Sequence, residues 1–292
     1  MIKRLLSQLR PALQGMDIED YLPMVEQFRR QHSSFPMTIS GLEIALFRSY
    51  LASQGVSEHT YWGGREVSMR TDITIPLVKD KAFLMRWIDY GVRKGFSAYK
   101  LKVSGQLKRD MELISFVHSQ LKDAGEGFCL RLDGNQGYDT RTFLQIADRL
   151  EKKDYAIELF EQPLRSNDTR GLKEITKRSP FPIILDETVL TGGDAERVAQ
   201  EGLAHGINIK TAKSGIVESR AILDTARRSG LKLMVGCMME TMVGLSAGIY
   251  LAAGTGSFDY VDLDAIHFLY HKNTYGDISL KGPCFKLKPG KE

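Results

Sequence analysis

Three short apolar runs in the middle of the chain each end in a carboxylate. The runs are LRLD, IELFE and IILD, and their final acids are Asp133, Glu161 and Asp186. The steps between these acids, 28 and 25 residues, suit one strand, one helix and two loops. Each acid is therefore predicted to stand at the C-terminal end of a parallel strand. Any one of them alone is equally compatible with an ordinary surface loop.

The matched positions of the three acids indicate a metal site. Three carboxylates that converge without a cation repel one another and raise their own pKa values. A hard divalent ion removes this repulsion, and an all-oxygen ligand set favours Mg²⁺ over zinc.

The strand and helix pattern from Met69 onward predicts the fold. Strands are expected near residues 70–75, 98–103, 128–133, 156–161, 183–187, 206–211, 232–237 and 260–264. Helices are expected between them, for example at 79–94 and 214–229. Eight strands joined by helix-length crossovers predict an α/β fold, a TIM-type (β/α) barrel over residues 67–292 with a C-terminal tail. The main alternative, a doubly wound open sheet, normally has a glycine-rich phosphate turn that TIPLVKD lacks.

The first part of the chain, residues 1–66, has helical periodicity and no strand pattern. Apolar residues recur at helical spacing up to Pro11, and a second helix is expected after Asp17. A third is expected to follow a capping box from Ser40 to Glu43 and to end near Gly55. We expect a small helical region ahead of the barrel.

Composition narrows the class of protein. The 292 residues are 42% hydrophobic and carry 40 basic and 36 acidic side chains, a net charge of +4. No block of like charge indicates a nucleic-acid or membrane surface, and no apolar run has the length of a membrane span. Three cysteines without metal spacing favour a reducing compartment. We expect a cytoplasmic protein with neither nucleic acid nor membrane as partner.

Two strands carry lysines on the face predicted to point into the barrel. In AYKLKV, Tyr99 and Leu101 share the face that packs on the helices, which sends Lys100 and Lys102 inward. Lys210 follows the same rule in the sixth strand. For either run taken alone, the alternative is that its lysines lie on the solvent-exposed face of an edge strand. Lysines on opposite sides of a barrel have the geometry to remove an α-proton from one face and return it to the other.

The ordered motifs YKLKV, LRLDGNQGY, IELFEQP, ILDET, INIKTAKSG and VGCMMET resemble the enolase superfamily, in the muconate-lactonizing enzyme subgroup. Enolase-superfamily sites use a Lys or His base with magnesium. The resemblance covers roughly residues 36–290. It implies that Lys102 and Lys210 are the acid/base catalysts and that Lys100 stabilises the enolate. It also implies one set of magnesium ligands, Asp133, Glu161 and Asp186.

The last predicted strand narrows the choice within the subgroup. Asp262 and Asp264 share one face of YVDLD, and dipeptide epimerases have such a pair for the α-ammonium of the substrate. The alternative is a pair of solvated acids or helix caps. Glu240 in VGCMMET is a weaker pocket candidate by the same resemblance. Family members begin with a three-stranded antiparallel sheet that precedes the helices of a capping domain. We therefore expect the helical region at residues 1–66 to be a truncated capping region. KSG also stands where the family often has a double glycine.

These features lead to one expected function and several alternatives. We expect a magnesium-dependent isomerase that epimerises the C-terminal residue of a small-molecule dipeptide, with L-Ala-D/L-Glu-type substrates leading. The alternatives in the same fold are an N-acylamino acid racemase, an o-succinylbenzoate synthase or a cycloisomerase. The Asp-x-Asp pair argues against them, because their substrates offer no ammonium. A further alternative is a catalytically impaired barrel that acts as a binding subunit. A homo-oligomeric assembly is also possible on this sequence.

Overall fold

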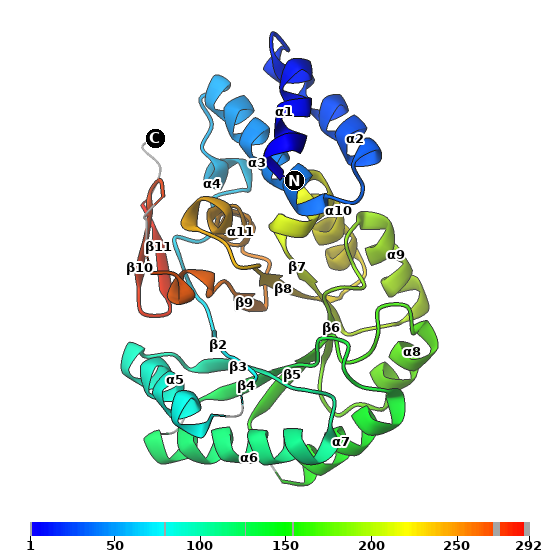
Figure 1. Ribbon diagram of the computed structural model, residues 1–292, viewed down its shortest axis with the longest axis vertical. Helices are drawn as coiled ribbons and strands as arrows, with labels where there is room; N and C mark the ends of the chain where they lie inside the picture. The colour runs from blue at the N-terminus through cyan, green and yellow to red at the C-terminus, as the bar shows by residue number, and fades with distance from the viewer. Residues whose placement is uncertain (1, 79, 126, 154, 271–274, 289–292) are drawn as a thin grey trace.

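The computed structural model describes residues 2–78, 80–125, 127–153, 155–270 and 275–288. Eight parallel strands stand in chain order in one sheet, with a helix between each strand and the next (Figure 1). The strands are β2 (Ile73–Ile75), β3 (Ala98–Lys102), β4 (Cys129–Asp133), β5 (Ile157–Glu161), β6 (Ile183–Leu185), β7 (Gly206–Ile209), β8 (Lys232–Gly236) and β9 (Tyr260–Asp262). The helices are α5 (Lys81–Lys94), α6 (Leu107–Ala124), α7 (Thr140–Lys152), α8 (Thr169–Arg178), α9 (Gly192–Glu201), α10 (Thr211–Arg228) and α11 (Met242–Thr255). The predicted (β/α) barrel is confirmed.

Alternation along β3 positions its side chains as predicted. Tyr99 and Leu101 are at most 1% exposed, and the Tyr99 ring lies against Gly91 of α5. Lys100 points the other way and reaches Glu161 inside the barrel. This orientation follows from the period of two in a β-strand.

Contacts between β9 and the segment leading into β2 nearly close the barrel. Asp72 donates its N–H to the carbonyl of Val261 at 3.2 Å, and Leu263 donates its N–H to Oγ1 of Thr71 at 2.7 Å. A short 3₁₀ helix, η2 (Ala265–Phe268), follows β9. The first and last strands are therefore held together largely by single hydrogen bonds and side chains.

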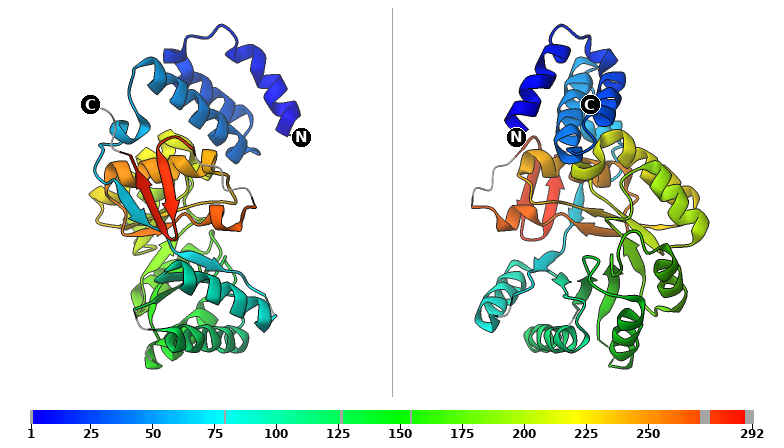
Figure 2. Two further views of the ribbon diagram at one scale, coloured as in Figure 1. Left: turned by 90° about the vertical axis from the view of Figure 1, so that its left-hand side faces the viewer. Right: turned by 45° about the vertical axis from the view of Figure 1, so that its right-hand side comes forward.

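A small antiparallel sheet lies beside the barrel and corrects the predicted start of the first strand. It has the order β1 (Ser68–Arg70), β11 (Cys284–Leu287) and β10 (Ile278–Lys281), seen in Figure 2. The residues at 70–72, expected in the first barrel strand, belong to β1 or to the link that precedes β2. The C-terminal tail pairs with β1, and this long-range pairing has no local signal in the sequence.

The N-terminal helices gather at one end of the molecule, next to α10 and α11 (Figure 1). They are α1 (Ile2–Leu13), η1 (Ile18–Asp20), α2 (Tyr21–Gln31), α3 (Pro36–Ser53) and α4 (Glu58–Tyr61). Asp17 caps η1 by accepting the N–H of Glu19, so the start expected after Asp17 is right, whereas α1 continues two residues beyond Pro11. Within the described ranges, no helix has the length and apolar character needed to cross a membrane.

The capping box predicted from Ser40 to Glu43 is wrong. The helix α3 begins at Pro36, whose fixed φ suits a first helical turn, and both polar residues lie inside the helix and are buried. They bind α10 instead, with Ser40 Oγ donating to the Lys213 carbonyl at 3.0 Å and Glu43 accepting the Val217 N–H at 2.9 Å. Gly215 has φ 74° there and gives Glu43 room, since a Cβ would lie 1.7 Å from its carboxylate.

Candidate active site

The three predicted metal acids lie at the carboxyl ends of adjacent barrel strands. Asp133 and Glu161 end β4 and β5 and are register partners, while Asp186 directly follows β6. Each of these residues is at most 5% exposed. The parallel ladder therefore brings acids that are distant in sequence to one end of the barrel.

Lysine ammonium groups bridge neighbouring acids in this cluster. Lys100 Nζ lies 3.1 Å from Glu161 Oε2 and 3.7 Å from Asp133 Oδ2. Lys210 Nζ lies 2.7 Å from Asp186 Oδ2 and 3.6 Å from Glu161 Oε1. The acids and lysines expected at the site thus form one contiguous group.

Lys102 and Lys210 approach the acids from opposite sides. Lys102 ends β3 and donates to Asp133 Oδ2 at 2.8 Å, whereas Lys210 follows β7 and donates to Asp186 Oδ2 at 2.7 Å. Strands β4, β5 and β6 separate the two. The Lys102 side chain is 36% exposed and that of Lys210 is 7% exposed. One amine therefore borders solvent and the other is enclosed.

Burial and charge act in opposite directions on this cluster. Burial raises the pKa of Asp133, and the nearby Glu161 carboxylate raises it further. Burial also opposes ionisation of Glu161, but the ammonium groups of Lys100 and Lys210 outweigh it and lower the pKa of Glu161. For both lysines, burial lowers the pKa and the surrounding carboxylates raise it above the ordinary value. The two buried lysines thus stay charged and favour the ionised form of Glu161, whereas burial and Glu161 disfavour ionisation of Asp133.

The donor set fits Mg²⁺. Asp133, Glu161 and Asp186 offer only carboxylate oxygens, which hard cations prefer. Lys213 donates to the carboxylate of Asp186 and, at 3.0 Å, to its carbonyl, which fixes that side chain. Beside it, Oε2 of Glu187 is buried and has no hydrogen-bond partner in the described structure. These residues suit a divalent cation, and their roles as ligands stay a prediction.

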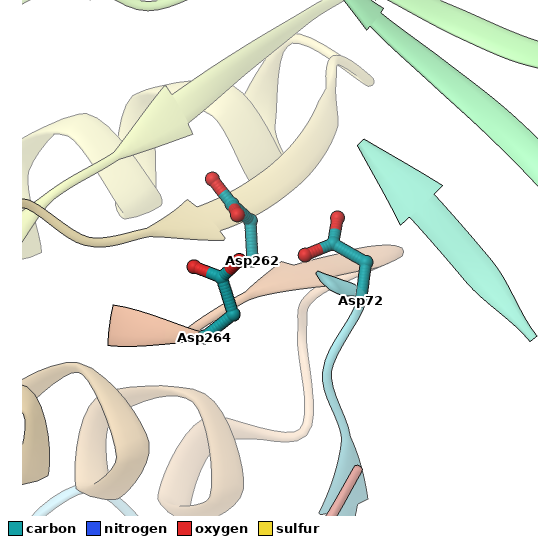
Figure 3. Close-up of side chains that lie close together, drawn as sticks. All are labelled: Asp72, Asp262 and Asp264. Carbon is teal, nitrogen blue, oxygen red and sulfur yellow. The ribbon is translucent and has the colours of Figure 1, made fainter. Parts of the chain in front are cut away.

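A second group of acids lies where β9 meets the start of β2. Asp72, Asp262 and Asp264 each offer an oxygen, and these atoms all lie within 4.8 Å of one another. Figure 3 shows the three side chains together, with Asp72 coming from a different segment than the other two. Asp72 is not among the site residues predicted from the sequence. Its position two residues before Thr74, on the inward face of TDITI, is the signal that could have identified it.

Oxygen atoms without donors remain in this second group. Lys100 donates to Oδ2 of Asp262 at 2.5 Å, and Arg131 donates to Oδ2 of Asp72 at 2.8 Å. In the described structure, Oδ1 of Asp72 and Oδ1 of Asp262 are buried and accept no hydrogen bond. Asp264 accepts the N–H of Thr74 at 2.6 Å, and burial together with the Asp262 charge raises the pKa of Asp264 to about 6. A small cation would relieve both the repulsion and the missing bonds.

A cavity of about 440 Å³ is lined by Asp186 from the first group of acids and by Asp262 and Asp264 from the second. Its described lining is Thr74, Pro76, Lys100, Lys102, Asn135, Asp186, Glu187, Lys210, Lys213, Cys237, Met238, Met239, Asp262, Asp264, Ala265 and Phe268. Glu240 is not part of that lining, and its carboxylate accepts the N–H of Met238 at 2.9 Å. A larger hollow of about 750 Å³ between α5 and α6 contains none of the predicted site residues. Six of the nine predicted site residues therefore line the smaller cavity, and none lines the larger hollow.

Comparison with known proteins identifies the family of the chain. Residues 84–290 match the family described as enolase C-terminal domain-like. An L-Ala-D/L-Glu epimerase from Thermotoga maritima is 30% identical over 282 residues, which are 96% of this chain and 79% of that protein.

Solved structures give the same result. A mandelate racemase/muconate lactonizing protein from Herpetosiphon aurantiacus superposes with a TM-score of 0.91 at 27% identity, covering 99% of this chain and 81% of that one. A dipeptide epimerase from Enterococcus faecalis, complexed with Mg and the dipeptide L-Leu-L-Tyr, superposes with a TM-score of 0.88 at 26% identity, covering 99% and 80%. The expected enzyme class, an isomerase of the racemase and epimerase type, is confirmed. The chain belongs to the enolase superfamily, in its mandelate racemase/muconate lactonizing enzyme group.

Proposed function

We propose that this protein is a magnesium-dependent dipeptide epimerase that inverts the α-carbon of the C-terminal residue by two-base 1,1-proton transfer. The observation that carries the proposal is the approach of Lys102 and Lys210 to one carboxylate cluster from opposite sides. The names of the Thermotoga and Enterococcus relatives support it. Dipeptides of the L-Ala-D/L-Glu type, after which the Thermotoga relative is named, are the reference substrates against which other N-terminal residues are compared.

Asp133, Glu161 and Asp186 would hold the magnesium ion. When bound, the ion supplies positive charge that makes a proton beside the substrate carboxylate more acidic. Lys100 adds fixed positive charge for the enolate, since its ammonium is buried and held by carboxylates on two strands.

Lys102 and Lys210 would exchange the α-proton. In one direction, the neutral amine of one lysine removes the proton from the α-carbon, and the ammonium of the other delivers a proton to the opposite face. The reverse reaction exchanges their roles. Both side chains line the same cavity, which lets one bound substrate meet both.

Asp262 and Asp264 would bind the α-ammonium of the dipeptide. Both are buried, and Oδ1 of Asp262 accepts no hydrogen bond in the described structure. A charge-assisted bond to a buried carboxylate is among the stronger polar contacts in proteins. An N-acylated amino acid has no such charge and would leave Oδ1 of Asp262 without a donor.

Deuterium exchange tests the proposal. The protein is incubated in deuterium oxide with magnesium and a library of L,L-dipeptides, and mass spectrometry detects a gain of about one dalton at the C-terminal residue of a substrate. We expect uptake that depends on magnesium and is lost in Lys102→Ala and Lys210→Ala. Chiral chromatography then identifies the epimer formed.

The other outcomes distinguish the alternatives. Exchange with N-acylated amino acids and with no dipeptide would identify an acylamino acid racemase. No exchange with either class, while magnesium still binds, would identify a catalytically impaired barrel. Either result would contradict the dipeptide epimerase proposal.

A further inference from the structure

The cavity has two chemically different walls. The arc contributed by β3, β4, β6 and β7 carries the charged groups, which are Lys100, Lys102, Asp186, Glu187, Lys210 and Lys213. The arc contributed by the ends of β8, β9 and β2 has an apolar surface, formed by Pro76, Cys237, Met238, Met239, Ala265 and Phe268. On this second arc, the described lining has no charged residue other than Asp262 and Asp264.

Packing behind the apolar wall fixes its shape. The Phe268 ring lies 4.9 Å from the ring of Trp87, and the Trp87 indole N–H donates to the Thr74 carbonyl at 2.5 Å. The Cys237 thiol is uncharged at neutral pH, because burial and the nearby carboxylate of Asp264 raise its pKa. The wall is thus a built surface whose members present carbon and sulfur atoms.

The acids lie at the base of this wall. Asp264 is the residue immediately before η2, which supplies Ala265 and Phe268, and its Oδ1 lies 3.9 Å from Cys237 Sγ. An α-ammonium bound there sits on a carbon that also carries the N-terminal side chain. That side chain has to leave the acids along the apolar wall, because the rest of the dipeptide extends toward the lysines.

We propose that Pro76, Met238, Met239 and Phe268 form a subsite for the N-terminal side chain, and that the preferred dipeptides begin with a residue larger and more apolar than alanine. The inference rests on the proposed function, since the ammonium position orients the substrate. Each buried methylene should raise kcat/KM about fourfold until the wall is covered. A charged side chain loses hydration against the wall and gains no partner there.

A matched pair of substrates tests this specificity. L-Norleucyl and L-lysyl dipeptides have side chains of similar length and differ in charge, and alanyl dipeptides supply the short reference. We measure α-deuterium exchange for the three with C-terminal L-Glu and again with C-terminal L-Leu. The expected order of kcat/KM is norleucyl, then alanyl, then lysyl, with norleucyl at least about tenfold above lysyl. Lysyl and norleucyl dipeptides of equal activity would overturn the inference and leave the epimerase proposal intact.

Variants of the apolar wall test whether it causes the preference for an apolar N-terminal side chain. Met239 is 66% exposed, so Met239→Glu should fold normally and raise the ratio of lysyl to norleucyl activity about fivefold. Met238→Glu, at the residue next to Cys237, whose Sγ lies 3.9 Å from Asp264, should raise it further. Met37→Glu on α3, where the methionine is 53% exposed, is the control and should leave the ratio unchanged. A ratio that moves in neither wall variant would exclude these residues as the subsite. Exchange with no dipeptide at all would instead refute the epimerase proposal, and this inference with it.

Discussion

Lys100 on β3 donates a 2.5 Å hydrogen bond to Asp262 on β9. The same ammonium lies 3.1 Å from Glu161, so Asp262 is tied to the lysine and carboxylate cluster. Asp264, two residues later, accepts a backbone N–H from Thr74 and is not tied to that cluster by any bond in the described structure. The two members of the Asp-x-Asp pair therefore have different partners, a buried ammonium for Asp262 and a backbone N–H for Asp264.

This difference predicts separate effects of two substitutions. Asp264→Asn should raise KM for dipeptides about tenfold or more, because a charge-assisted bond to the ammonium is lost, and should affect N-acylated amino acids far less. Asp262→Asn should raise KM for dipeptides as well and should in addition lower kcat, because Lys100 loses the charge of its shortest carboxylate contact. Steady-state kinetics on both substrate classes measures these effects. Equal losses for both classes in Asp264→Asn would refute its role in ammonium binding.

The pKa of Asp264 predicts a pH dependence. Burial and Asp262 raise it from 3.8 to about 6, so the carboxylate loses its charge as pH falls through 6. Dipeptide kcat/KM should therefore decline below about pH 6, and Asp264→Asn should lack this acidic limb. The sign for folding is opposite, since an acid with a raised pKa destabilises the fold when ionised. The unfolding free energy contributed by this group should fall as pH rises from about 4 to 6.

Removal of either proposed base should abolish inversion. Lys102→Ala and Lys210→Ala each leave one of the two proposed bases in the cavity, so we expect one variant to exchange the α-proton of L-dipeptides and the other that of their epimers. Proton NMR in deuterium oxide with each purified stereoisomer measures this selectivity. Full epimerisation in both variants would contradict the assignment of two bases.

Magnesium should stabilise the fold. At 100 times its Kd, a ligand adds about 2.7 kcal/mol to the unfolding free energy. Calorimetric scans with and without magnesium measure the shift, which Glu161→Gln should abolish. Asp148→Asn, on the solvent-facing side of α7, is the control and should keep it. An identical shift in wild type and Glu161→Gln would show that magnesium acts elsewhere.

The contact between α3 and α10 should contribute strongly to stability. Glu43 is fully buried and accepts hydrogen bonds from Arg29 at 2.6 Å and from the Val217 N–H at 2.9 Å. Glu43→Ala should therefore lower the unfolding free energy by about 3–5 kcal/mol, measured by urea denaturation. Glu26→Ala breaks an exposed pair with Arg30 and should cost less than about 1 kcal/mol. Similar losses in the two variants would contradict this distinction.

Local periodicity was sufficient to predict the barrel and much of its interior. The inward direction of Lys100 followed from Tyr99 and Leu101 on the other face, because alternation in a strand depends only on backbone geometry. The same rule predicted Lys210 and the acids at strand ends. These residues form one cluster in the structure.

Local patterns did not predict the role of polar residues that bind a segment distant in the sequence. Ser40 and Glu43 have the spacing of a capping box, but both bind α10, at Lys213 and Val217, which are more than 170 positions away. Local propensity cannot register such contacts, and tertiary packing overrides it.

The sequence by itself determined which residues face into the barrel and at which end of each strand the acids stand, because both follow from the period of two and the parallel repeat. Only the tertiary structure decided what each inward group meets. Closure of β9 onto the start of β2 joins Asp72 to Asp262 and Asp264. The same closure assembles the apolar wall from the ends of β8, β9 and β2. These contacts join strands that are far apart in the chain. They depend on how the whole chain folds, so a short stretch of sequence does not predict them.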